Sequence, residues 1–251
     1  MSIEVVYNSL GNYTYTTVAP EKRTDAGRVI NAEQIKKLDT PKLLEKFGPF
    51  HLKASSPPNG TSYDWVYLKH SKTGGRAVMV VPVMKKDGED HIVFIRTLRP
   101  ALYAERLAPD SIEVPAGMVG DEREGESIEN ALRTELEEEG GLKLLDYEIL
   151  LNNINSAGGV YAETIVLAKA TVDENMFEPT SKTKDDGVTL ERHVVPVKDV
   201  QKWLREQDAL GVSINGSTMS ALFMLAPQYP ELINLPKDYV PESGSRLDYV
   251  A

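Results

Sequence analysis

The pattern of apolar and polar positions predicts strands interleaved with a few helices over most of the chain. A continuous apolar run at 77–84 predicts a buried strand, and the polar segment that follows it predicts a hairpin turn into a strand at 91–98. Apolar residues at helical spacing predict a helix over 127–139, which Gly140 and Gly141 end. Further strands are predicted at 63–70, 144–152, 162–170 and 190–196, and further helices at 200–207 and 217–225.

The first part of the chain is harder to assign from its pattern. Residues 32–47 are compatible with a helix, whereas the SSPPNGTS segment at 55–62 predicts a loop. Strands interleaved with helices favour an α/β or α+β sandwich. We therefore expect an N-terminal extension with a β-hairpin at 1–75, a main domain at 76–240 and a tail at 241–251.

Composition narrows the chemistry. The formal net charge of -10 argues against a general nucleic-acid binder, which would carry a basic face. There is no cysteine, and the four histidines are scattered, so a metal would be held by oxygen, as Mg²⁺, Mn²⁺ and Ca²⁺ are. No apolar run approaches the roughly 18 residues of a membrane span, and we see no secretory signal. We therefore expect no membrane association and a cytoplasmic location.

The predicted helix at 127–139 carries an unusual group of carboxylates. Glu135, Glu138 and Glu139 lie three and four positions apart, so they share one face of the helix. Like charges at this spacing repel, and the negative end of a helix disfavours them further. A bound divalent cation would remove both costs. The alternative is a solvated acidic face, which is what most glutamate runs on helices are.

The surrounding residues resemble the Nudix box, whose pattern is G-x5-E-x7-R-E-U-x-E-E-x-G-U with U aliphatic. Its positions are occupied here by Gly120, Glu126, Thr134, Glu135, Leu136, Glu138, Glu139, Gly141 and Leu142. Every position fits except the arginine, which is Thr134. The resemblance implies a Nudix-type α/β/α sandwich of mixed sheets, and it implies that the three glutamates hold Mg²⁺, with Mn²⁺ as an alternative.

Two departures from the family pattern matter. The box arginine orients a neighbouring glutamate in the family, and here Arg133, one position away, is a candidate to replace it. The segment EVPAG is followed by eight residues before Glu126, three more than the family's ADP-sugar members have. This spacing suggests that Gly117 is the structural counterpart of the box glycine and that Gly120 matches by chance.

Flanking segments resemble the ADP-ribose pyrophosphatase branch of the family over roughly residues 60–226. The segment IRTLRPALYAERLAPDSIEVPAG is similar to the branch's Q-x-R…E-x-PAG pattern, with Thr97 in place of the glutamine. The resemblance implies that Arg99 binds the diphosphate, a role that suits a guanidinium fork. It also implies that Glu113 accepts a hydrogen bond from the substrate or the metal's ligands, and that the carbonyl of Ala116 is a metal ligand.

The same resemblance supplies candidates for the rest of the site. Trp65 would stack on the nucleobase, Gly158 and Gly159 would approach the substrate through their backbone, Glu163 would bind substrate or metal, and Asp186 would be the general base. The glycine register is open, because matching Ser156 to the motif serine requires one inserted residue. A plain turn, an edge-strand glutamate and a core tryptophan are the structural alternatives.

The resemblance as a whole implies Mg²⁺-dependent hydrolysis of ADP-ribose, or a related ADP-sugar, to AMP and a sugar phosphate. One alternative is a UDP-sugar or other nucleoside diphosphate-sugar diphosphatase, which would use the same metal-binding residues. Another is a Nudix-fold module that binds ADP-ribose without hydrolysing it. In this branch the N-terminal hairpin is exchanged within a dimer, so we expect residues 1–75 to form a homodimer.

Overall fold

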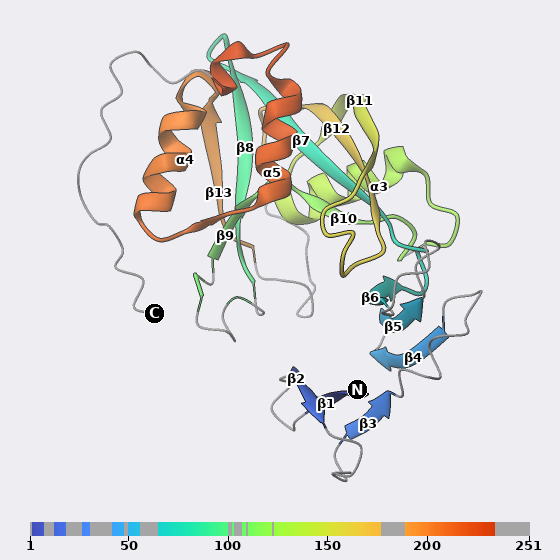
Figure 1. Cartoon of the computed structure of the whole chain (residues 1–251). Helices are drawn as coiled ribbons and strands as arrows, with labels where there is room; N and C mark the ends of the chain where they lie inside the picture. Colours follow the sequence, from blue (N-terminus) through green and yellow to red (C-terminus); the bar gives the residue numbers. More distant parts are fainter. Residues whose placement is uncertain are drawn as a thin grey trace. The chain divides into compact units, whose positions relative to one another are not determined.

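The computed structural model divides the chain into two compact units: Met1–Gly75 with Ala157–Glu163, and Arg76–Ser156 with Thr164–Ala251 (Figure 1). It describes residues 2–7, 13–18, 27–30, 42–47, 50–55, 65–99, 102, 107–108, 110–121, 123–176 and 189–233. The predicted tail at 241–251 and the candidate base Asp186 lie outside these residues. Within the described part, no helix is long and apolar enough to cross a membrane.

The first unit contains two antiparallel three-stranded sheets, ordered β2-β1-β3 and β4-β5-β6. Their strands are β1 (Ser2–Tyr7), β2 (Tyr13–Val18), β3 (Gly27–Ile30), β4 (Lys42–Phe47), β5 (Phe50–Ser55) and β6 (Trp65–His70). Residues 157–163 join this unit although they come from the middle of the chain.

The helix expected at 32–47 is wrong for residues 42–47, which form β4; residues 32–41 lie outside the described part. Two features of the sequence explain the error. Pro41 would interrupt a helix at this point, and the Gly-Pro pair at 48–49 favours a turn. The two segments that flank this pair form β4 and β5, with Phe47 opposite Phe50.

The second unit is built on a mixed sheet of eight strands, in which β7 and β12 are parallel, β9 and β14 are parallel, and the other pairs are antiparallel. The central order is β11-β12-β7-β8-β9-β14, while β10 pairs with β7 and β13 with β8. The strands are β7 (Arg76–Lys86), β8 (Glu89–Leu98), β9 (Asp110–Glu113), β10 (Ala116–Met118), β11 (Leu144–Ile154), β12 (Thr164–Val172), β13 (Thr189–Pro196) and β14 (Ser213–Ile214).

The hairpin of β7 and β8 follows the sequence pattern closely. Residues 77–84 are buried on both faces of the sheet, as expected of a continuous apolar run in a central strand. The turn is narrower than the predicted segment, because both strands extend into it. It consists of Asp87 and Gly88 alone, whose φ angles of 51° and 83° are those of a type I′ turn.

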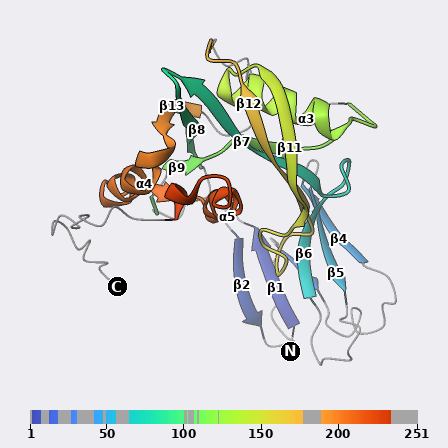
Figure 2. The same cartoon turned by 90° about the horizontal axis from the view of Figure 1, so that it is seen from above.

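Helices cover both faces of this sheet, as Figure 2 shows from above. They are α3 (Ile128–Glu135), α4 (Val200–Ala209) and α5 (Gly216–Leu225), with short helical turns η1 (Leu136–Gly140), η2 (Val197–Asp199) and η3 (Pro230–Leu232). One core cluster joins α4 and α5 to one face of the sheet, and a second joins α3 to the other face. The α/β/α sandwich expected from the sequence is thus confirmed.

The acidic helix differs from the predicted continuous helix in its last turn. It begins at the N-cap Ser127, whose hydroxyl accepts a hydrogen bond from the Asn130 N–H at 3.2 Å. Beyond Glu135 it continues as η1, a π-helical turn that is capped by Gly141 in the left-handed conformation, with φ of 59°. Such widened turns are rare, and they occur often at functional sites.

Candidate active site

The sequence-predicted site residues fall into two groups. The second unit holds Arg99, Glu113, Ala116, Glu135, Glu138 and Glu139, whereas the first unit holds Trp65, Gly158, Gly159 and Glu163. The first group carries the candidate metal and diphosphate ligands, and the second carries the candidate contacts to the nucleobase and sugar.

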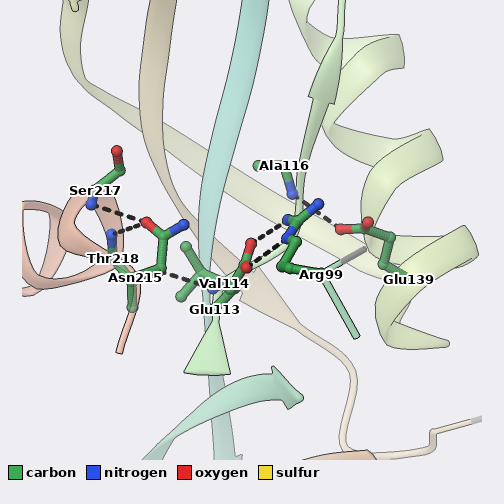
Figure 3. Close-up of polar contacts among 8 residues, drawn as sticks. All are labelled: Arg99, Glu113, Val114, Ala116, Glu139, Asn215, Ser217 and Thr218. Carbon is green, nitrogen blue, oxygen red and sulfur yellow. Dashed lines mark hydrogen bonds and ion pairs between the residues drawn. The ribbon is translucent and has the colours of Figure 1, made fainter. Parts of the chain in front are cut away.

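Arg99 and Glu113 bind each other at the ends of β8 and β9 (Figure 3). The Arg99 Nε donates to Glu113 Oε1 at 2.7 Å, and Nη2 donates to Oε2. The Glu113 side chain is buried, whereas that of Arg99 is 42% exposed. Hydrogen bonding to Glu113 raises the pKa of Arg99, and the nearby charge of Glu139 raises it further. The guanidinium is therefore permanently charged and oriented beside the acidic helix.

The strand that carries Glu113 is anchored to the start of α5. The Val114 N–H donates to the Thr218 hydroxyl at 3.2 Å, and the Asn215 N–H donates to the Ile112 carbonyl at 3.1 Å. Asn215 also caps α5 through its side-chain oxygen (Figure 3). These bonds hold the end of β9 against a rigid helix, so the backbone that carries Glu113 is fixed in position.

Two box glutamates contact the short strand β10. Glu139 Oε2 accepts a hydrogen bond from the Ala116 N–H at 3.0 Å (Figure 3). Glu135 lies against Gly117 so closely that a Cβ on Gly117 would be 2.0 Å from Glu135 Oε1. The acidic helix therefore packs directly against the PAG segment. This segment is the candidate source of a carbonyl ligand. Glycine at 117 is what leaves room for the carboxylate.

The acidic groups repel one another in this arrangement. The pKa of Glu135 lies well above its usual value, first because the carboxyl is buried and then because of the charges of Glu139 and Glu138. Asp121 and Glu126 contribute in the same direction. The site thus concentrates negative charge where only a cation would compensate it.

The donor set suits a divalent cation in chemistry and charge. Carboxylate oxygens and a backbone carbonyl are the ligands that Mg²⁺ and Mn²⁺ prefer. The buried, charge-crowded carboxylate of Glu135 and the space that Gly117 leaves for it match this requirement. Across the described residues, no three acidic or histidine side chains are gathered as a metal-binding group. The fit to a hard cation therefore rests on the chemistry of the oxygen donors and on their charge, and not on a preformed cluster of three such side chains in the described part of the chain.

Metal addition is expected to stabilise the fold, because a cation that binds only the folded state relieves the repulsion around Glu135. At a concentration 100-fold above its dissociation constant it would add about 2.7 kcal/mol. Thermal unfolding in Mg²⁺ or Mn²⁺, reversed with EDTA, measures this effect. The variant Glu135→Gln should unfold at a higher temperature without metal and should lose most of the metal-induced shift. Melting temperatures insensitive to metal would contradict the assignment.

The first two box positions contact each other. The Gly120 N–H donates to Glu126 Oε2 at 3.0 Å, and Gly120 has a φ of 86°, a conformation that favours glycine. The match of Gly120 to the box therefore has a structural basis and need not be a coincidence. Gly117 has a separate role against Glu135.

The expectation that Arg133 substitutes for the missing box arginine is not supported. Its Nη2 donates to Glu129 Oε1 at 3.2 Å, one turn back on the exposed side of α3. Arg133 lies two positions before Glu135, which is about 200° around the helix, so its side chain points away from the face that Glu135 occupies.

In the first unit, the segment with the candidate glycines pairs with the strand that begins at Trp65. The Leu68 N–H donates to the Val160 carbonyl and the Ala162 N–H donates to the Leu68 carbonyl, each at 2.8 Å. The backbone of 157–163 is thus fixed beside β6. Glu163 is close enough to contribute to the raised pKa of Tyr161, about 12, which is due first to burial.

Gly75 is a residue of this region that sequence reasoning did not single out. A Cβ on Gly75 would lie 2.1 Å from the Ala162 carbonyl oxygen, whereas a Cβ on Gly74 would meet nothing within 4 Å. Both glycines have positive φ angles, of 86° and 66°. A Gly-Gly pair in a sequence is typical of a turn, but only the fold brings Ala162 against this one.

The variant Gly75→Ala is expected to be less stable than Gly74→Ala by about 1–3 kcal/mol. Both changes introduce a left-handed alanine, but only the first also forces the backbone at Ala162 to move. Urea unfolding of the two variants gives the difference directly. Equal losses of stability would show that the segment 157–163 is not seated on Gly75.

Comparison with known proteins shows which proteins this chain is similar to. No family model matches the chain. It is 28% identical over 160 residues to proteins named ADP-ribose pyrophosphatase from Escherichia coli K12 and Shigella flexneri, covering 64% of this chain and 72% of each relative. The fold is similar to the crystal structure of an ADP compounds hydrolase, with a TM-score of 0.55 and 21% identity, covering 78% of this chain and 95% of that one.

These similarities confirm the resemblance drawn from the box: in sequence and in fold, the chain is similar to Nudix-type hydrolases. Within that class it is similar to the ADP-ribose pyrophosphatases, the branch that the flanking motifs indicated.

Proposed function

We propose that this enzyme hydrolyses the diphosphate of ADP-ribose, or of a related ADP-sugar, to AMP and a sugar phosphate, with Mg²⁺ as cofactor and Mn²⁺ as a substitute. The observation that carries the proposal is the docking of Glu135 and Glu139 onto the PAG segment beside Arg99. The names of the relatives, ADP-ribose pyrophosphatase, support the choice of substrate.

Glu135, Glu138, Glu139 and the carbonyl of Ala116 would hold the cation. When bound, it supplies Lewis acidity toward the phosphate oxygens and lowers the pKa of a water molecule. Arg99 would neutralise part of the diphosphate charge, and its bidentate pairing with Glu113 orients it for this role. Phosphoryl transfer depends mainly on such positioning and charge stabilisation.

The proposed reaction is a displacement by water at one phosphorus. The water oxygen bonds to phosphorus, the bridging P–O bond breaks, and the leaving phosphate keeps the electron pair of that bond. The proton of the water passes to a general base. We assign this role to Asp186, which lies outside the described residues.

The first unit would bind the rest of the substrate and a second subunit. Trp65 would stack on adenine, a contact that is generally worth about 1–3 kcal/mol per base. Gly158 and Gly159 would approach the substrate through their backbone, and Glu163 would bind the substrate or the metal. The pairing of 157–163 with β6 supports a joint role for these residues. We also propose a homodimer formed through residues 1–75.

Product analysis with ADP-ribose and, in parallel, UDP-glucose tests the proposal. In Mg²⁺ we expect AMP and ribose 5-phosphate from ADP-ribose, little product from UDP-glucose, and stronger inhibition by AMP than by UMP. Preference for UDP-glucose and UMP would establish a UDP-sugar diphosphatase instead. Binding of ADP-ribose without turnover in Mg²⁺ or Mn²⁺ would establish a binding module.

A further inference from the structure

The acidic helix has no arginine of its own on the glutamate face. The box slot for arginine is occupied by Thr134, and Arg133 is paired with Glu129 on the exposed side. In the family pattern this arginine supports the glutamates, and here Arg99 is a cation near Glu139 that comes from outside the helix. A further cation reaches the end of the same helix from elsewhere in the fold.

Arg192 of β13 reaches the end of this helix. Its Nη1 donates to the carbonyl oxygen of Gly140, the last residue of η1, at 3.1 Å. Both residues belong to the second unit, and Arg192 is half-buried. Its backbone is fixed opposite Ile95 in the pairing of β13 with β8. A rigid strand therefore presents a guanidinium to the helix end.

The bond satisfies a group that the helix itself cannot satisfy. The last carbonyls of a helix have no partner within it. In η1, the Leu136 carbonyl accepts from the N–H groups of Gly141 and Leu142, whereas Gly140 is buried and its carbonyl receives the Arg192 side chain. Glu138 and Glu139 lie within this turn, so its geometry sets the directions of both carboxylates.

The charge of Arg192 is as relevant as the hydrogen bond. The C-terminal end of a helix carries partial negative charge, and here it also carries the side chains of Glu138 and Glu139. A guanidinium at this end offsets part of the field while making a directed bond.

We propose that Arg192 replaces the missing box arginine as a positioning residue: it fixes the turn that carries Glu138 and Glu139 and so prepares the cation site. The inference rests on the proposed function only in that these glutamates hold a divalent cation. It does not depend on which nucleotide is the substrate.

The variant Arg192→Met tests the proposal, with Arg133→Met as the matched control on the outer side of the helix. Mn²⁺ affinity is measured by calorimetry on each folded protein, alongside hydrolysis of ADP-ribose. Loss of a group that supports metal ligands typically costs 10- to 100-fold in metal affinity or activity. We therefore expect Arg192→Met to weaken Mn²⁺ binding at least about 10-fold and to lower kcat with little change in KM. Arg133→Met should match the unmodified protein.

A second change distinguishes positioning from general stability. Introducing Thr134→Arg into the Arg192→Met variant restores a box arginine, and we expect it to recover a large part of the Mn²⁺ affinity. A lower melting temperature with unchanged Mn²⁺ affinity would assign Arg192 a structural role only and overturn the proposal. Absence of rescue by Thr134→Arg would overturn it as well. If the unmodified protein binds Mn²⁺ but cleaves no substrate, the proposed function fails while the Mn²⁺ comparison still decides the role of Arg192.

Discussion

Replacing Glu139 with glutamine is expected to abolish turnover of ADP-ribose while leaving the protein folded. The amide oxygen of glutamine can still accept the hydrogen bond from the Ala116 N–H, so the contact between η1 and β10 remains. What is lost is the negative charge of a proposed metal ligand. We expect the rate to fall by more than about 100-fold, the upper end of what loss of a supporting residue usually costs.

The matched control is Glu129→Gln, which makes the same chemical change on the exposed side of α3. Glu129 pairs only weakly with Arg133 across one helical turn, and an exposed pair of this kind contributes little to stability. Steady-state rates and thermal unfolding of both variants complete the comparison. Full activity of Glu139→Gln would show that the metal assignment is wrong.

The second large effect is expected from Gly117→Ala. The backbone of Gly117 does not require glycine, since its φ is outside the positive range, but a Cβ there would be 2.0 Å from Glu135 Oε1. The end of a glutamate side chain can rotate away, so we expect the melting temperature to change little. The carboxylate, however, would leave its place. Metal affinity and activity should therefore fall together by at least about 10-fold.

Gly216→Ala serves as the control, because a Cβ at that position meets nothing within 4 Å and its backbone is also ordinary. Mn²⁺ titration, rates and unfolding are measured for both variants. An active Gly117→Ala variant with normal Mn²⁺ affinity would mean that Glu135 does not need its present position. A loss of activity caused by unfolding would appear in the melting temperature.

Long, strongly patterned elements of this fold were predictable from sequence. The apolar run of β7, the Asp-Gly turn and the amphipathic spacing of α3 each specify their structure locally. The short strands β10 and β14 were not predicted, because they have three and two residues and exist through pairing with distant segments. The helix expected at 32–47 is wrong over 42–47, because these residues pair with β5 and form a strand.

In the candidate site, too, some features were predictable from sequence and others depend on the fold. The box and the PAG segment identified the carboxylates and Arg99, because their spacing in sequence carries the information. Sequence did not show that Arg99 and Glu113 bind each other, since the contact depends on how β8 and β9 pair. Arg192 follows the box by some 50 residues and matches no local motif, so only the fold brings it to Gly140.

A phosphorus NMR spectrum of ADP-ribose incubated with the purified protein in Mg²⁺ shows directly whether the protein hydrolyses the diphosphate. We expect the diphosphate signals to disappear, signals of two phosphate monoesters to replace them, and EDTA to stop the change. Persistence of the diphosphate signals in Mg²⁺ and in Mn²⁺, with folded protein that binds ADP-ribose, would contradict this expectation.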